Sequence, residues 1–98
     1  MDLNTDITVV MSTYNRCEIL PAAIESVLNQ EASEISYELI VVDNNSTDST
    51  KEVVHSFISR GHPNLRYVFE PKQGLSHGRN AGITNARGSI IVLSLIHI

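Results

Sequence analysis

Three polar segments of the chain carry residue types that can bind a ligand. The first, residues 12–16, reads Ser-Thr-Tyr-Asn-Arg and follows an apolar run. A tyrosine ring can stack on a base or a ribose, and Thr and Asn can hydrogen bond to base edges. The same residues are common in ordinary strand-to-helix turns. This segment alone therefore leaves a ligand site and a plain turn as alternatives.

The second segment, residues 43–48, reads Asp-Asn-Asn-Ser-Thr-Asp after another apolar run. A carboxylate at its start can accept hydrogen bonds from a base N–H or from ribose hydroxyls. Such residues also cap helix N-termini, and capping is the better interpretation of Ser46, Thr47 and Asp48. Asp43 stands one position too early to cap the helix, so a ligand-binding role and a structural role both stay open for it.

The third segment, residues 74–82, reads Gly-Leu-Ser-His-Gly-Arg-Asn-Ala-Gly. Arg79 can contact a phosphate or brace Asp43, and an ordinary surface arginine is the alternative. The Gly-x-x-x-Gly spacing of Gly74 and Gly78 is a weak signal. Neither the dinucleotide fingerprint nor the phosphate-loop pattern occurs in the sequence.

Short β-branched runs alternate with segments of helical period, and these elements must position the three polar segments. Strands are predicted at residues 7–11, 38–43, 65–69 and 89–94, and helices at residues 20–28, about 48–60 and 75–86. The order βαβαβαβ, with connections long enough for right-handed crossovers, predicts an α/β fold: a three-layer Rossmann-like parallel sheet. The small residues of the third helix predict close packing.

Ligands of open parallel sheets bind beyond the carboxyl ends of the strands. This rule selects residues 12–16, residues 43–46 and the segment after Ser94. The first two carry polar side chains suited to a ligand, whereas the last reads Leu95-Ile96-His97-Ile98 and does not.

The composition narrows the range of partners. A net charge of -4 argues against nucleic acid, whose binding needs clustered Lys and Arg. The single cysteine, Cys17, excludes a disulfide within the chain and suits a reducing compartment such as the cytoplasm. The longest apolar stretch, residues 90–98, is too short to span a membrane, so no span is predicted in this chain.

The segments in this order and spacing resemble the family 2 glycosyltransferases of the GT-A fold. The matching pieces are residues 13–16, 26–30, 41–50, 70–76, 78–82 and 86–91, and the resemblance runs from about Ile7 to Val92. It implies a site for a nucleotide-diphospho-sugar of the UDP or GDP type. In that family the positions of Thr13, Tyr14 and Asp43 hold the base and ribose, and that of Arg79 helps complete the pocket. The full candidate nucleotide-binding set is Thr13, Tyr14, Asn15, Asp43, Asn45 and Arg79.

The resemblance also implies a divalent metal, Mg²⁺ or Mn²⁺, held after the fourth strand by an Asp-x-Asp type motif. Residues 95–98 contain no carboxylate, and His97 is a poor ligand for a hard cation. We therefore expect residues 1–94 to form the nucleotide-sugar-binding half of a GT-A domain, and residues 95–98 to be an apolar tail in place of the acidic metal motif. Such a truncated fragment would hold no catalytic residue and no metal ligand, and would be inactive alone.

Two other interpretations stay open. A short non-catalytic nucleotide-binding or oligomerisation module would keep the pocket without the reaction. A phosphoacceptor receiver domain would need acidic residues after the first strand, where Ser12 and Thr13 stand instead. Half of a sheet would expose a strand edge and apolar side chains, Leu93, Leu95, Ile96 and Ile98 among them, which predicts a homo-oligomer. The predicted location is cytoplasmic, at the cytoplasmic membrane face if a longer protein is membrane-attached.

Overall fold

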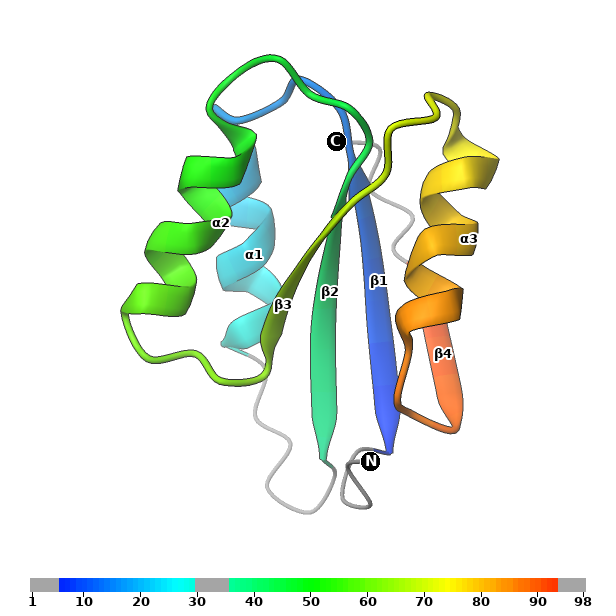
Figure 1. The fold of residues 1–98 in the computed structure, drawn as a ribbon. Coiled ribbons are helices and arrows are strands. Elements are labelled where there is room, and N and C mark those ends of the chain that lie inside the picture. The colour runs from blue at the N-terminus through cyan, green and yellow to red at the C-terminus, as the bar shows by residue number, and fades with distance from the viewer. Residues whose placement is uncertain (1–5, 30–35, 94–98) are drawn as a thin grey trace.

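The computed structural model describes residues 6–29 and 36–93. Its elements alternate strictly: β1 (Ile7–Thr13), α1 (Leu20–Leu28), β2 (Tyr37–Asp43), α2 (Thr50–Ser59), β3 (Leu65–Phe69), α3 (Leu75–Asn85) and β4 (Ile90–Leu93). The strands form one parallel sheet in the order β3-β2-β1-β4. Helices α1 and α2 cover one face and α3 covers the other (Figure 1). The predicted three-layer α/β fold is confirmed.

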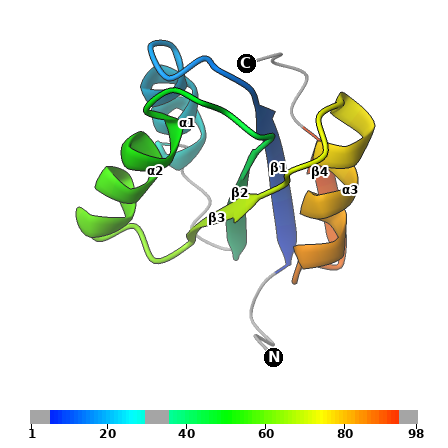
Figure 2. The same cartoon turned by 45° about the horizontal axis from the view of Figure 1, so that its top comes forward.

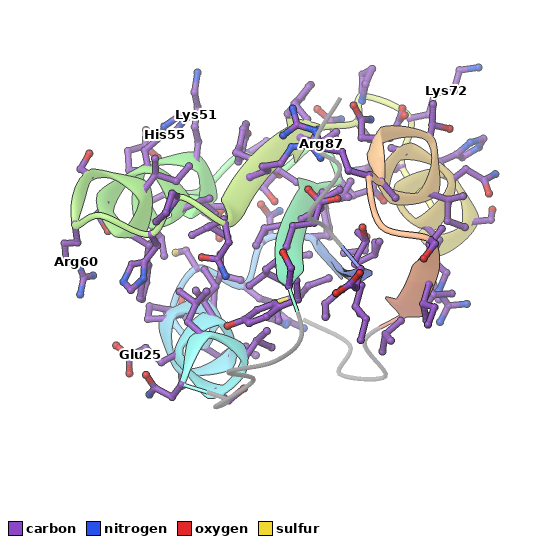
Figure 3. The ribbon with its side chains drawn as sticks, turned by 90° about the horizontal axis from the view of Figure 1, so that it is seen from below. Glu25, Lys51, His55, Arg60, Lys72 and Arg87 are labelled. Atoms are coloured by element: carbon purple, nitrogen blue, oxygen red, sulfur yellow. The ribbon has the colours of Figure 1, made fainter. Side chains whose placement is uncertain are left out.

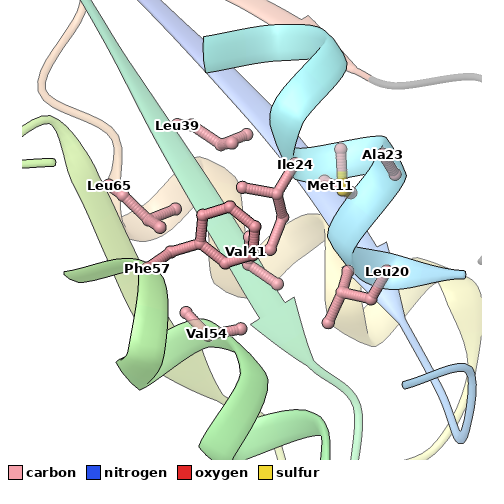
Figure 4. Packing of buried hydrophobic residues seen from close by; sticks show 9 residues of the cluster. All are labelled: Met11, Leu20, Ala23, Ile24, Leu39, Val41, Val54, Phe57 and Leu65. Atoms are coloured by element: carbon pink, nitrogen blue, oxygen red, sulfur yellow. The ribbon is translucent and has the colours of Figure 1, made fainter. Parts of the chain in front are cut away.

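Alternation along the central strands supplies both apolar faces of the sheet. In β2, Leu39 and Val41 point toward α1 and α2, whereas Ile40 and Val42 point toward α3. All four side chains are fully buried, as is typical of a central parallel strand. Figure 4 shows the larger cluster, in which the ring of Phe57 lies among aliphatic side chains of the sheet and α1.

Helix α3 packs unusually close to β1 because it presents glycines to that strand. A Cβ atom added to Gly78 would overlap the side chain of Ser12, and one added to Gly82 would overlap that of Val10. The close packing predicted from the small residues of this helix is confirmed. The carboxyl end of β1 is thereby pressed against the start of α3.

Several predicted boundaries were wrong by one or two residues, among them the starts of β2 at Tyr37 and β4 at Ile90. Strand β1 continues through Thr13, because its last two residues pair with Val42 and Asp43 of β2. Helix α2 begins at Thr50, and Asp48 precedes it, accepting the Thr50 N–H at 3.0 Å. Helix α3 ends at Asn85, because the next residue is already extended, with ψ of 139°.

A buried carboxylate fastens the amino end of the sheet. Glu38 accepts hydrogen bonds from the Thr8 hydroxyl, the Arg87 N–H and the Arg66 guanidinium, each at 2.7 Å. Thr8 in turn accepts the Gly88 N–H at 2.9 Å. Burial raises the pKa of Glu38, but the bonds from Arg66, Thr8 and Arg87 outweigh it and lower that pKa overall. Figure 3 views the molecule from this end and labels Arg87.

Candidate functional site

The carboxyl ends of β1 and β2 lie side by side. Thr13 and Asp43 are register partners, and the N–H of Asn44 donates to the Thr13 carbonyl at 2.8 Å. The two polar turns that follow these strands therefore leave the sheet next to each other (Figure 2). This adjacency of the first two predicted segments follows directly from parallel pairing.

Asn15 joins the two turns. Its backbone N–H donates to the Ser46 hydroxyl at 3.0 Å, and its side-chain Oδ1 accepts the Thr47 N–H at 2.7 Å. Asn15 and Asn45 both have left-handed backbone conformations, with φ of 49° and 64°, which asparagine tolerates better than most residues. The structure therefore gives Asn15 a bracing role between the turns.

A first hollow, which we call the β1 hollow, opens at the end of β1 and has a volume of about 340 Å³. Its lining residues are Ser12, Thr13, Tyr14, Arg16, Asn44, Gln73, Gly74 and Leu75. Tyr14 is 45% exposed. Thr13 is only 1% exposed, yet its hydroxyl has no hydrogen-bond partner within the described part of the chain. A buried hydroxyl without a partner is costly, so Thr13 is an unsatisfied polar residue beside the hollow.

A second hollow, the Asp43 hollow, lies on the side of α2 and has a volume of about 480 Å³. Its lining residues are Asp43, Ser46, Thr47, Asp48, Lys51, Glu52, Tyr67 and Phe69. The Asp43 carboxylate is 2% exposed; it accepts the Ser46 N–H at 2.9 Å and the Tyr67 hydroxyl at 2.6 Å. Burial, followed by this bond to Asp43, raises the pKa of Tyr67. The tyrosine therefore remains a hydrogen-bond donor at neutral pH.

The candidate residues are thus divided between neighbouring places. Thr13 and Tyr14 line the β1 hollow, and Asp43 lines the Asp43 hollow. Arg79 is half-buried on α3, directly after Gly78, and lines neither hollow. Arg79 lies near this end of the sheet but does not contact Asp43.

Sequence reasoning assigned no role to two residues that the structure brings into this region, Asn44 and Tyr67. Asn44 lines the β1 hollow and is 5% exposed. The signal for Asn44 was its position directly after a buried strand. The signal for Tyr67 was its place in the alternation of β3, which puts it on the α2 face with Leu65.

The described residues hold no group of three or more His, Cys, Asp or Glu side chains that could bind a metal ion. The predicted apolar tail, residues 95–98, lies outside the described ranges. Within residues 6–29 and 36–93, none of the helices is long and apolar enough to cross a bilayer.

Comparison with known proteins decides the family. The model of glycosyl transferase family 2 matches residues 8–94. The chain belongs to this family. This family 2 glycosyltransferase chain is 35% identical over 86 residues to glycosyltransferase AglE of Haloferax volcanii, covering 87% of this chain and 28% of AglE. It is 33% identical over 87 residues to a GalNAc(5)-diNAcBac-PP-undecaprenol beta-1,3-glucosyltransferase of Campylobacter jejuni, covering 87% of this chain and 27% of that protein.

A solved mannosyltransferase structure shares the fold. The mannosyltransferase PcManGT from Pyrobaculum calidifontis, in complex with GDP-Man and Mn²⁺, superimposes with a TM-score of 0.78 at 30% identity. The match covers 87% of this chain and 25% of the mannosyltransferase. The glycosyltransferase chain described here thus spans about a quarter of the length of these relatives. Its α/β fold is that of a GT-A glycosyltransferase.

Proposed function

We propose that this chain forms the nucleotide-binding part of a transferase that moves a sugar from a nucleotide-diphospho-sugar to an acceptor. The observation that carries the proposal is the β1 hollow, which is lined by Thr13, Tyr14 and Asn44. It lies at the carboxyl end of a central parallel strand, where such sheets bind ligands. The GDP-Man complex of the matching mannosyltransferase supports a donor of the UDP or GDP type.

In this proposal the residues at the ends of β1 and β2 hold the nucleoside. Thr13 supplies a hydroxyl, and the exposed ring of Tyr14 stacks on the base or ribose. Asp43 accepts a hydrogen bond from the base or the ribose through the lone pairs that Ser46 and Tyr67 leave free. The fixed orientation of its carboxylate supports this role.

The remaining candidates act around the nucleoside. Asn15 and Asn45 shape the two turns, and Asn15 also keeps its side chain at their junction. Arg79 contacts the ligand from α3 once a nucleotide is bound. The half-buried position of Arg79 supports this placement, because it follows Gly78, where an added Cβ would meet Ser12 and Asn44.

A divalent cation, Mg²⁺ or Mn²⁺, is part of the proposal for the whole enzyme and would neutralise the leaving diphosphate. The Mn²⁺ of the matching mannosyltransferase complex supports it. The described residues of this chain do not fit such a site, because they offer no carboxylate cluster. No step of the proposal for this chain therefore runs through a metal.

Four further expectations belong to the same proposal. Residues 1–94 act as the nucleotide-sugar-binding half of a domain, residues 95–98 take no part in metal binding, the protein works in the cytoplasm, and copies associate through the β4 edge. Exposed side chains of Ile90 and Val92, at 57% and 45%, support association. Sedimentation of a single monomeric species at high concentration would count against it.

The proposal is tested by calorimetric titration with UDP and GDP, with and without Mn²⁺, of the wild-type chain and of Asp43→Ala. We expect binding without metal that is lost in the variant. A chain that is folded by circular dichroism but binds neither nucleotide under either condition would refute the proposal. The family match does not favour the alternative of a non-catalytic module.

A further inference from the structure

Asn44 connects the end of β1 with the segment before α3, and both line the β1 hollow. It is 5% exposed, directly follows β2, and its backbone N–H is bonded to Thr13 at the end of β1. Its side chain reaches the segment between β3 and α3. The amide Nδ2 donates to the carbonyls of Glu70, at 3.3 Å, and Lys72, at 2.7 Å, and Oδ1 accepts the Gly74 N–H at 2.9 Å.

The segment that Asn44 holds, residues 70–74, leads directly into the site. Figure 2 shows it crossing the carboxyl ends of β2 and β1 before α3 begins. Its last two residues, Gln73 and Gly74, line the β1 hollow together with Leu75, the first residue of α3. The position of this wall therefore depends on what fixes the segment.

The other hydrogen bonds of the segment do not tie its far end to the sheet, because the Gly74 carbonyl accepts the Gly78 N–H of α3 at 3.1 Å. The Glu70 N–H donates to the Asp43 carbonyl at 2.9 Å, which anchors only the start. The Glu70 carboxylate accepts the Lys72 N–H at 2.8 Å, which is a bond within the segment itself. At Gly74 the backbone has φ of 132°, a conformation that glycine adopts readily. Asn44 is thus the side chain that ties the far end of the segment to the end of β2.

The side-chain amide of Asn44 satisfies these three backbone groups. Two carbonyl oxygens need donors and one N–H needs an acceptor, and asparagine offers both. An aspartate could accept from Gly74, but in its ionised form it would face the two carbonyls with no proton to give. The identity of residue 44 is therefore explained by the segment that it binds.

We infer that Asn44 is a positioning residue for the nucleotide. It holds residues 70–74 so that the amide of Gln73 and the first turn of α3 face the ligand in the β1 hollow. The inference rests on the proposed function of that hollow and adds a residue to it. Asn44 acts on the ligand through the position of residues 70–74. Loss of its side chain therefore lowers the fraction of molecules whose site is arranged to bind a nucleotide.

The test compares Asn44→Ala and Asn44→Asp with Glu38→Gln. Glu38 is buried at the opposite, amino end of the sheet, so its variant reports destabilisation without a change in the site. Affinity for UDP and GDP is measured by calorimetry at a temperature where circular dichroism shows every variant to be folded. We expect both Asn44 variants to bind about tenfold more weakly or worse, because the ready arrangement becomes a minor state, and Glu38→Gln to bind as the wild type does.

Two further readouts separate positioning from simple stability. Affinity of Asn44→Asp, relative to wild type at each pH, should recover in part as the pH falls, because the protonated acid can donate to one carbonyl again. Hydrogen exchange at the Gly74 amide should accelerate in Asn44→Ala and stay slow in Glu38→Gln.

The outcomes are distinct. If the wild-type chain binds a nucleotide and both Asn44 variants bind it with the same affinity, the positioning role alone is overturned. Absence of UDP and GDP binding by the wild-type chain overturns the proposed function and the positioning role with it. Weak binding by Glu38→Gln, equal to that of the Asn44 variants, would show that affinity follows stability and would also overturn the inference.

Discussion

The hydroxyl of Tyr67 donates a hydrogen bond of 2.6 Å to Oδ2 of Asp43. Tyr67 pairs with Val41 in the register of β2 and β3, so its side chain lies on the same face as that of Asp43, two residues further along β2. The other carboxylate oxygen accepts the Ser46 N–H. One strand and one turn thus hold the carboxylate from opposite sides.

We expect Tyr67→Phe to lower the free energy of unfolding by about 1.5–3 kcal/mol, the range for a hydrogen bond to a charged group. The ring is kept, so the loss reports the hydroxyl. Urea unfolding measures it. Tyr37→Phe is the matched control, because its hydroxyl reaches only neutral carbonyls at 3.3 and 3.4 Å. Equal losses in the two variants would contradict a special bond to Asp43.

Glu38 should make the stability of the protein pH-dependent on the acid side. Its folded pKa is lowered, so its contribution is complete above the ordinary glutamate pKa of about 4.3 and is lost as the pH falls through the folded value. Glu38→Gln should therefore destabilise the fold by about 1–3 kcal/mol at pH 7 and by less at pH 3. Urea unfolding at both pH values checks this; a difference independent of pH would contradict it.

Gly82 should not tolerate a methyl group. Because an added Cβ would overlap Val10, we expect Gly82→Ala to destabilise the fold by about 1–3 kcal/mol, in spite of the higher helix propensity of alanine. Ser76→Ala, at an exposed position of the same helix, should change little. Adding Val10→Ala should relieve part of the strain, so thermal unfolding of the double variant should reveal favourable coupling. Strict additivity would argue against the close contact.

The backbone conformation of Asn15 predicts that a glycine variant is more stable than an alanine variant, the reverse of the usual order. With φ of 49°, this position favours glycine over alanine by about 1 kcal/mol. Asn15→Ala should therefore unfold more easily than Asn15→Gly, although both lose the bond to Thr47. Asn29, which ends α1 with φ of -86° and ψ of 0°, should show the usual order, with alanine the more stable variant. Denaturant midpoints of the alanine and glycine variants at both positions test these two orders of stability.

Local patterns predicted most of the fold, and non-local pairing explains what they missed. The apolar runs and helical periods gave the order of elements, because each reflects the face that its own residues bury. Thr13 was taken for a turn residue, since nothing local shows that it pairs with Asp43. The bonds of Asn44 to residues 70–74 depend on a chain crossing that no local pattern contains.

The sequence predicted which turns form the candidate site, but not where their individual side chains lie. Parallel pairing guarantees that the segments after β1 and β2 meet, and the residues there were selected on that ground. Strand face does not decide which hollow each residue borders, because Thr13 and Asp43 are register partners on the same face of the sheet and still border different hollows. The direction of Arg79 depends on how Gly78 and Gly82 set the rotation of α3.

Strand β1 lies between β2 and β4, and its hydroxyl at Thr8 accepts the Gly88 N–H from 80 residues away. During synthesis, β1 leaves the ribosome with one side ready for β2, while its other neighbour follows only after roughly 4–16 seconds at ordinary elongation rates. Until then a three-stranded intermediate carries an open strand edge, whose backbone N–H and C=O groups are unpaired. The intermediate folds correctly only if β1 does not pair with a strand of another molecule before β4 is made. The rate of translation and the availability of chaperones therefore influence the yield of folded protein.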